Sequence, residues 1–161
     1  ELNQMNQDDF VAALVWIFED SPWVAAKAWA KKPFTDISSL YQSMVDVVRE
    51  ASDAEKLALV CAHPDLGAKA KMAEASVKEQ AGVGLDRLSP EEYDKFNYLN
   101  QAYKAKFNFP FIIAVRNHTK ESILASFSQR LENTKDQELH TVLIEIEKIA
   151  LFRLQKVIDD D

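Results

Sequence analysis

The chain has 161 residues, of which 47% are hydrophobic and only three are glycine, and its formal net charge is −7. A chain of this length usually holds about eleven glycines, so an all-β domain, a Rossmann fold and a P-loop are disfavoured. The acidic balance also disfavours nucleic acid or an anionic membrane as a partner. We therefore predict an all-α protein of about seven to nine helices with one irregular loop region. It forms a single domain over 1–161, with a core at about 8–158.

Hydrophobic periodicity and helix-end residues predict four helices before the first glycine. In chain order they run from Asp8 to Asp20, from Ser21-Pro22 to just before Pro33, from a cap at Asp36 or Ser38 through Val48, and from Ser52 to His63. Ser52 and Glu55 form a capping box, in which each residue covers the other's backbone donor. Proline disfavours helical geometry at the residue before it, so His63 should lie at a helix end ahead of Pro64.

The irregular stretch from Ala68 to Leu88 holds Gly82 and Gly84, and three further helices follow it. Their predicted starts are Ser89-Pro90, Thr119, and Thr134 with Gln137. Between the first two lies Phe109–Val115, an apolar and β-branched stretch with the composition of a strand. A lone strand has no partner in a helical protein, so we expect a buried extended crossing or the start of another helix.

Two groups of polar residues are candidates for chemistry. His63 at a fixed helix end can donate or accept a proton near neutral pH, or it is only a histidine stabilised by the helix dipole. Ser76, Glu79 and Gln80 would share one face of a helical turn and hold a polar ligand, or they form a solvated face.

Two arginines beside apolar residues are further candidates, because arginine binds carboxylates bidentately. They are Arg116, directly after the apolar stretch, and Arg153, inside the last helix; the alternative for Arg153 is a surface arginine with a buried stem. Cys61 should be a small core residue, since no second Cys/His pair supports a zinc site. The three tryptophans should fill the core, and His118 and His140 should lie at the surface.

Four ordered motifs together resemble the family of 2-oxo-4-hydroxy-4-carboxy-5-ureidoimidazoline (OHCU) decarboxylases. They are His63-Pro64-Asp65-Leu66-Gly67, Ser76-Val77-Lys78-Glu79-Gln80 leading to Gly84-Leu85, the stretch from Phe109 to Arg116, and Glu145 to Ala150 with Arg153-Leu154. The resemblance extends from about Asp8 to Leu154. Many members of the family have glycine where this chain has Asn108 and Asn117. Asparagine is the next most tolerant residue for left-handed backbone geometry, so the backbone path can be kept.

The resemblance implies an all-helical, usually dimeric lyase that needs no metal or organic cofactor and forms S-allantoin in urate degradation. It implies that His63 is the catalytic acid or base, with Glu79 and Arg153 as its partners. Substrate contacts would come from Pro64, Ser76, Gln80, Phe111, Ile112, Ile113, Ala114, Val115 and Arg116. The backbone of 111–115 would offer free amides to ring carbonyls, because no sheet uses them. The enzyme would be fused to a urate oxidase or work with one.

Two other functions are compatible with the residues alone. A non-enzymatic helical interaction module would need an exposed apolar stripe, and a hydrolase would use His63 and Glu79 with a metal. The sequence has neither a signal-peptide pattern at its start nor an apolar run of about 20 residues. We therefore expect a cytoplasmic protein with no membrane partner.

Overall fold

A computed structural model describes residues 2–18, 21–63, 88–115 and 118–159. Within these residues all regular secondary structure is helical, which confirms the prediction of an all-α fold. The helices belong to two compact units, one formed by Glu1–Ala62 with Glu147–Asp161 and the other by His63–Ile146. Except for its last residue, Leu88, the stretch predicted to be irregular lies outside the described residues.

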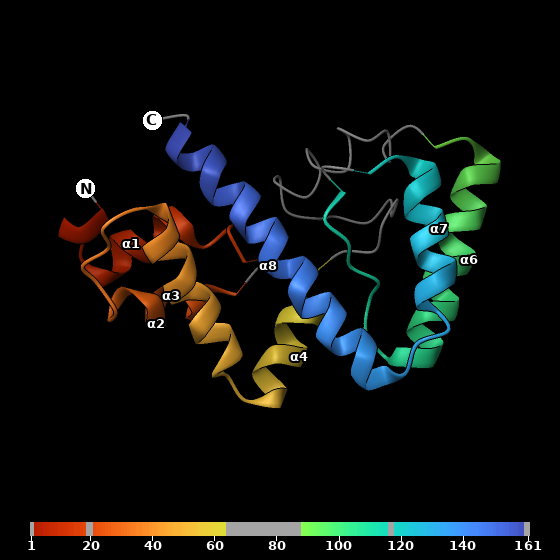
Figure 1. Cartoon of the computed structure of the whole chain (residues 1–161), viewed down its shortest axis with the longest axis horizontal. Coiled ribbons are helices and arrows are strands. Elements are labelled where there is room, and N and C mark those ends of the chain that lie inside the picture. The colour runs from red at the N-terminus through yellow and green to blue at the C-terminus, as the bar shows by residue number, and fades with distance from the viewer. Residues whose placement is uncertain (1, 19–20, 64–87, 116–117, 160–161) are drawn as a thin grey trace. The chain divides into compact units, whose positions relative to one another are not determined.

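The first unit holds the N-terminal helices and the C-terminal part of the last helix (Figure 1). Its elements are the 3-10 helix η1 (Leu2–Gln4), α1 (Gln7–Leu14), α2 (Pro22–Trp29), α3 (Ile37–Arg49), α4 (Asp53–Cys61) and the end of α8 (Lys135–Asp159). Asp36 caps α3 by accepting the N–H of Ser39 at 2.8 Å. The predicted Ser52–Glu55 capping box is present at the start of α4. Local N-cap signals therefore fix where these helices begin.

Three expectations for this unit are wrong: the end of the first helix, the burial of Cys61 and the burial of the tryptophans. The first helix ends at Leu14 rather than Asp20, although Ile17 and Phe18 beyond it are buried. The chain leaves the helix through a tighter turn, in which the Ile17 N–H donates to the Leu14 carbonyl at 3.1 Å. Cys61 is exposed instead of filling the core, because helix α4 buries its neighbours Leu59 and Val60.

The tryptophans are half-buried rather than part of the core. The indole N–H of Trp16 donates to the Ala13 carbonyl at 3.2 Å, and that of Trp29 donates to the Met5 carbonyl at 2.9 Å. A tryptophan has one polar atom that needs a partner, so such residues settle where an apolar face meets free backbone carbonyls.

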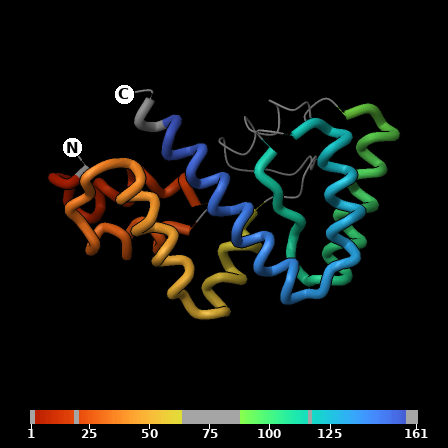
Figure 2. Tube along the Cα trace, viewed as in Figure 1, coloured from red at the N-terminus to blue at the C-terminus, as the bar shows by residue number. Residues whose placement is uncertain are grey.

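The second unit is built from α6 (Pro90–Phe107), α7 (Lys120–Arg130) and the beginning of α8. The chain that joins α6 to α7 runs as a non-helical trace alongside α7 (Figure 2). We call Phe109–Val115 the crossing segment. The predicted N-caps are observed: Ser89 with Glu92 and Thr119 with Ser122 form capping boxes. Gln137 and Thr134 exchange the corresponding bonds before α8 at 2.9 and 3.2 Å.

Aromatic side chains form the core of the second unit. Phe111 stacks on Phe127 with ring centroids 3.7 Å apart, and the Tyr103 ring meets Phe111 edge-on at 5.3 Å. Phe107 and Phe109 pack on the same tyrosine at 4.5 and 5.9 Å. Each such pair contributes on the order of 1 kcal/mol beyond its area burial. The phenylalanines of the crossing segment therefore fix it against α6 and α7.

No helix in the described parts of the chain is both long enough and apolar enough to cross a membrane.

Candidate active site

His63 lies directly after the C-terminus of α4, as the His-Pro motif predicts. The helix ends at Cys61 with Ala62 as its C-cap, and the His63 side chain is buried, with 8% of its surface exposed. Histidine can donate or accept a proton near neutral pH, so the prediction of a reactive imidazole concerns a buried residue at a helix end.

The crossing segment begins at a backbone turn that asparagine makes possible. Asn108 ends α6 in the left-handed region, with φ 63° and ψ 25°, and its N–H donates to the Lys104 carbonyl at 2.8 Å. This confirms the expectation that asparagine adopts left-handed geometry at position 108. Beyond the turn, every residue from Phe109 to Val115 is buried, so the segment is the buried crossing that the sequence predicts.

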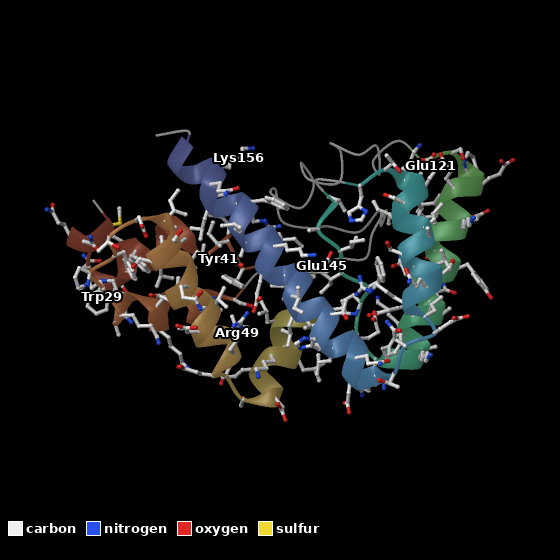
Figure 3. All side chains as sticks on the ribbon, viewed as in Figure 1. Trp29, Tyr41, Arg49, Glu121, Glu145 and Lys156 are labelled. Carbon is white, nitrogen blue, oxygen red and sulfur yellow. The ribbon has the colours of Figure 1, made fainter. Side chains whose placement is uncertain are left out.

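Two side chains hold the backbone of the crossing segment. The Arg130 Nη1 donates to the Ile112 carbonyl at 2.8 Å. The Ala114 N–H donates to the Glu145 carboxylate at 3.1 Å; Glu145, on α8, is labelled in Figure 3. The prediction that the amides of 111–115 are all free is therefore wrong at Ala114. In contrast, the N–H groups of Ile112 and Ile113 have no hydrogen-bond acceptor among the described residues.

A buried network of polar side chains supports the Arg130 contact. The Nε of Arg130 pairs with the Glu138 Oε1 at 2.8 Å, and Glu138 has no exposed surface. The same oxygen accepts the Tyr103 hydroxyl at 2.7 Å, and the second carboxylate oxygen accepts the Asn133 amide at 2.9 Å. The Arg130 guanidinium also lies 4.2 Å from the Phe111 ring centroid. Burial, and next the hydrogen bond to Glu138, raise the pKa of Tyr103 far above its ordinary value, so the hydroxyl stays protonated.

Arg153 is buried, with 3% of its surface exposed, and belongs to the first unit. Its Nη1 donates to the carbonyls of Trp16 at 2.8 Å and Ile17 at 3.4 Å. Arg153 therefore holds the turn that follows α1, and the alternative of a surface arginine is wrong.

The other predicted site residues lie outside the described part of the chain. These are Pro64, Ser76, Glu79, Gln80 and Arg116, together with Asn117 and the three glycines. Among the described residues, no group of three or more His, Cys, Asp or Glu side chains is arranged to hold a metal ion.

The alternative of an interaction module needs an apolar stripe along a helix. In the described ranges the exposed large hydrophobic residues are Leu57, Tyr98 and Ile144. They lie on α4, α6 and α8, one on each helix. A stripe needs at least two such residues at a spacing of three or four, so none of the described helices carries one.

The sequence analysis does not identify Arg130, Glu138 and Glu145, although the hydrophobic pattern places all three on buried helix faces. Arg130 follows Ile123 and Phe127 at the spacing i, i+4, i+7, which is the buried face of α7. Glu138 and Glu145 share the corresponding face of α8 with Val142. A charged residue at a core position must find a buried partner, and this rule, applied to all charged residues, would have identified these three.

Comparison with known proteins places the chain in a family. The family model described as OHCU decarboxylase matches residues 3–155, across both units. The chain is 41% identical to a 2-oxo-4-hydroxy-4-carboxy-5-ureidoimidazoline decarboxylase of Halalkalicoccus jeotgali over 157 residues, which are 98% of this chain and 89% of that protein. It is 42% identical to a uric acid degradation bifunctional protein of a Bacillus species, again over 98% of this chain but over only 31% of the larger protein.

A solved structure agrees with this relationship. The crystal structure of an (S)-allantoin synthase superimposes with a TM-score of 0.75 at 34% identity, over 97% of this chain and 52% of that one. The ordered motifs of the sequence and these matches along nearly its whole length lead to the same conclusion. The chain belongs to the OHCU decarboxylase family.

Proposed function

We propose that this protein is a carboxy-lyase that converts 2-oxo-4-hydroxy-4-carboxy-5-ureidoimidazoline to S-allantoin in urate degradation, without a metal or organic cofactor. The observation that carries the proposal is the family match over residues 3–155. It is supported by the buried His63 at the end of α4.

The chemistry follows from the substituents of the substrate. Ring carbon 4 carries a hydroxyl and a carboxylate, and an imidazoline ring retains one double bond next to it. When the bond to the carboxylate breaks, carbon dioxide leaves and the electron pair of that bond forms a double bond between carbons 4 and 5. The carbon–nitrogen double bond at carbon 5 becomes a single bond, and its nitrogen takes up a proton. The hydroxyl then loses its proton and becomes a ring carbonyl, while carbon 5 gains a proton. Delivery of that proton to one face sets the S configuration.

The proposal gives each candidate residue a role in these steps. His63 exchanges the protons at the hydroxyl and at carbon 5, because imidazole titrates near neutral pH. Glu79 holds the tautomer of that imidazole. Arg153 binds the leaving carboxylate or the developing negative charge, which a well-placed donor stabilises by roughly a few kcal/mol.

The remaining contacts orient the ring. Pro64, Ser76 and Gln80 contact the substrate, and the backbone of 111–115 lines the pocket together with Arg116. The family resemblance supports these assignments. The burial of all five residues from Phe111 to Val115 supports the part that concerns the backbone, since a pocket wall must exclude water.

A histidine replacement tests the proposed function directly. In His63→Ala, freshly oxidised urate should no longer yield optically active allantoin, while the far-ultraviolet circular dichroism stays that of the wild type. His140→Ala, an exposed histidine on α8, is the matched control and should turn over normally. Glu79→Ala and Arg153→Ala should also lower turnover. Normal turnover in His63→Ala would refute the assignment, and inhibition by a chelator would favour the metal-dependent hydrolase.

We also propose a homodimer that acts after a urate oxidase, either fused to it or as a separate cytoplasmic protein. The bifunctional uric acid degradation protein, of which this chain matches 31%, supports the link to a second activity in urate degradation. Light scattering coupled to size-exclusion chromatography measures the dimer. A coupled assay that starts from urate and an added urate oxidase tests whether the two steps run in sequence.

A further inference from the structure

Burial of the Arg130–Glu138 pair carries a desolvation cost, and stabilisation of the fold is not a sufficient reason for it. Both side chains are buried, with 8% and 0% of their surfaces exposed, and removing two charges from water costs several kcal/mol each. The Nη2 atom of Arg130 is also buried without a hydrogen-bond partner among the described residues. Buried ion pairs can often be replaced by apolar residues without loss of stability, so the pair calls for a role other than stabilisation.

What the pair provides is a fixed backbone carbonyl. The guanidinium is held on one side by Glu138, itself bound by Tyr103 and Asn133, and it stacks on the Phe111 ring. Its Nη1 then has one geometry, in which it donates to the Ile112 carbonyl at 2.8 Å. The network therefore ties the Ile112 carbonyl, which lies in a segment without regular structure, to helices α7 and α8.

A second anchor lies two residues further along the chain. Glu145 accepts the Ala114 N–H at 3.1 Å. In an extended chain the N–H and C=O of one residue share a side, and alternate residues repeat that side. Side chains of α7 and α8 thus bind the Ile112 carbonyl and the Ala114 N–H, as a neighbouring strand would bind one edge of an extended segment. The N–H of Ile113, which lies between these two anchored groups, has no acceptor among the described residues.

We propose that Arg130, held by Glu138, and Glu145 are positioning residues for the substrate: they bind one edge of the crossing segment so that the Ile113 peptide groups point at the ring carbonyl and ring N–H of the bound ureidoimidazoline. This inference rests on the proposed function. The side chains replace a partner strand on one edge and leave the other edge for the ligand. Such contacts act on substrate binding, so their loss changes KM more than kcat.

The test replaces the pair and measures both kinetic constants. Arg130→Lys keeps the charge, but a lysine has no planar fork of donors, so it cannot bind Glu138 and the Ile112 carbonyl as the guanidinium does. We expect KM to rise at least tenfold and kcat to fall less than threefold. The double variant Arg130→Met/Glu138→Leu removes both charges together and should show the same split. The control is Arg49→Met, at a residue of the first unit that is labelled in Figure 3. It breaks the 3.0 Å ion pair of Arg49 with Glu147, which belongs to the same unit, and should leave both constants unchanged.

A merely structural role gives a different result. Partial unfolding removes active molecules and so lowers kcat at unchanged KM; that result, or unchanged constants in Arg130→Lys, would overturn the inference. Should the double variant fail to fold, Arg130→Lys alone decides. A wild-type protein that forms no S-allantoin would refute the proposed function instead, so the two failures are distinguishable.

Discussion

Replacing Tyr103 by phenylalanine removes one hydroxyl from the buried network and leaves the aromatic core in place. The ring is fully buried and contacts Phe107, Phe109, Phe111 and Phe127, and phenylalanine keeps all of these contacts. The change removes the 2.7 Å hydrogen bond of the hydroxyl to Glu138. A hydrogen bond to a charged group is worth about 1.5–3 kcal/mol, so Tyr103→Phe should lower the free energy of unfolding at pH 7 by that amount.

The same variant has a pH dependence whose sign follows from the raised pKa of Tyr103. In the unfolded chain the hydroxyl ionises with a pKa of about 10, whereas in the folded protein it keeps its proton. Its stabilising effect is thus fully present below pH 10 and is lost as the pH rises further. At pH 11 ionisation favours the unfolded wild type by about 1.4 kcal/mol. The difference between wild type and Tyr103→Phe should therefore shrink by that amount between pH 8 and pH 11.

Urea denaturation followed by circular dichroism at pH 8 and pH 11 measures both quantities. The raised pKa of Tyr41, whose hydroxyl is partly buried against Glu147, affects both proteins alike and cancels in the difference. Tyr98→Phe is the control, and because this side chain is 71% exposed it should change the free energy of unfolding little. A difference between wild type and Tyr103→Phe that stays constant from pH 8 to pH 11 would refute the reasoning.

Two further predictions concern backbone turns and caps. Asn108→Ala should lower the free energy of unfolding by about 1–2 kcal/mol, because alanine is strained at φ 63°; Asn108→Gly should cost much less, and equal urea midpoints for the two variants would contradict this. Glu92→Gln should lower the urea midpoint at pH 7, and this effect should shrink as the pH falls below the usual pKa of a glutamate. The Ser89 N–H, and next Lys120, hold the pKa of Glu92 below its usual value, so the stabilisation is present above that usual value and is lost as the pH falls through the folded pKa.

The parts of the fold that the sequence predicts are those set by local interactions. A capping box joins residues three apart, and the boxes at Ser52 and Ser89 are present where the sequence places them. The left-handed turn at Asn108 is also local, since it depends on one residue's steric tolerance. The end of the first helix depends instead on a distant residue. Arg153, 136 residues along from Ile17, binds the carbonyls of the turn that follows α1.

The candidate site also has parts that depend on local interactions and parts that depend on distant ones. His63 is predictable because proline constrains the residue before it, and the crossing segment is predictable from its apolar run. The partners of that segment are not, because Arg130 and Glu145 lie 18 and 31 residues away from the groups they bind. Periodicity shows that these charges fall on buried faces, but it does not show which backbone atom each one meets. That information depends on how the chain between them folds.

The charged residues on the buried faces of α7 and α8 follow from the presence of a non-helical segment in a helical core. A helix satisfies its own backbone groups, whereas a buried extended segment has two edges of N–H and C=O groups that need partners. A sheet would satisfy both edges and leave nothing for a ligand. Here side chains bind the Ile112 carbonyl and the Ala114 N–H, and each needs a charged or strongly polar group that reaches into the core. An all-α protein that buries such a segment in its core must therefore place charges where its helices would otherwise be apolar.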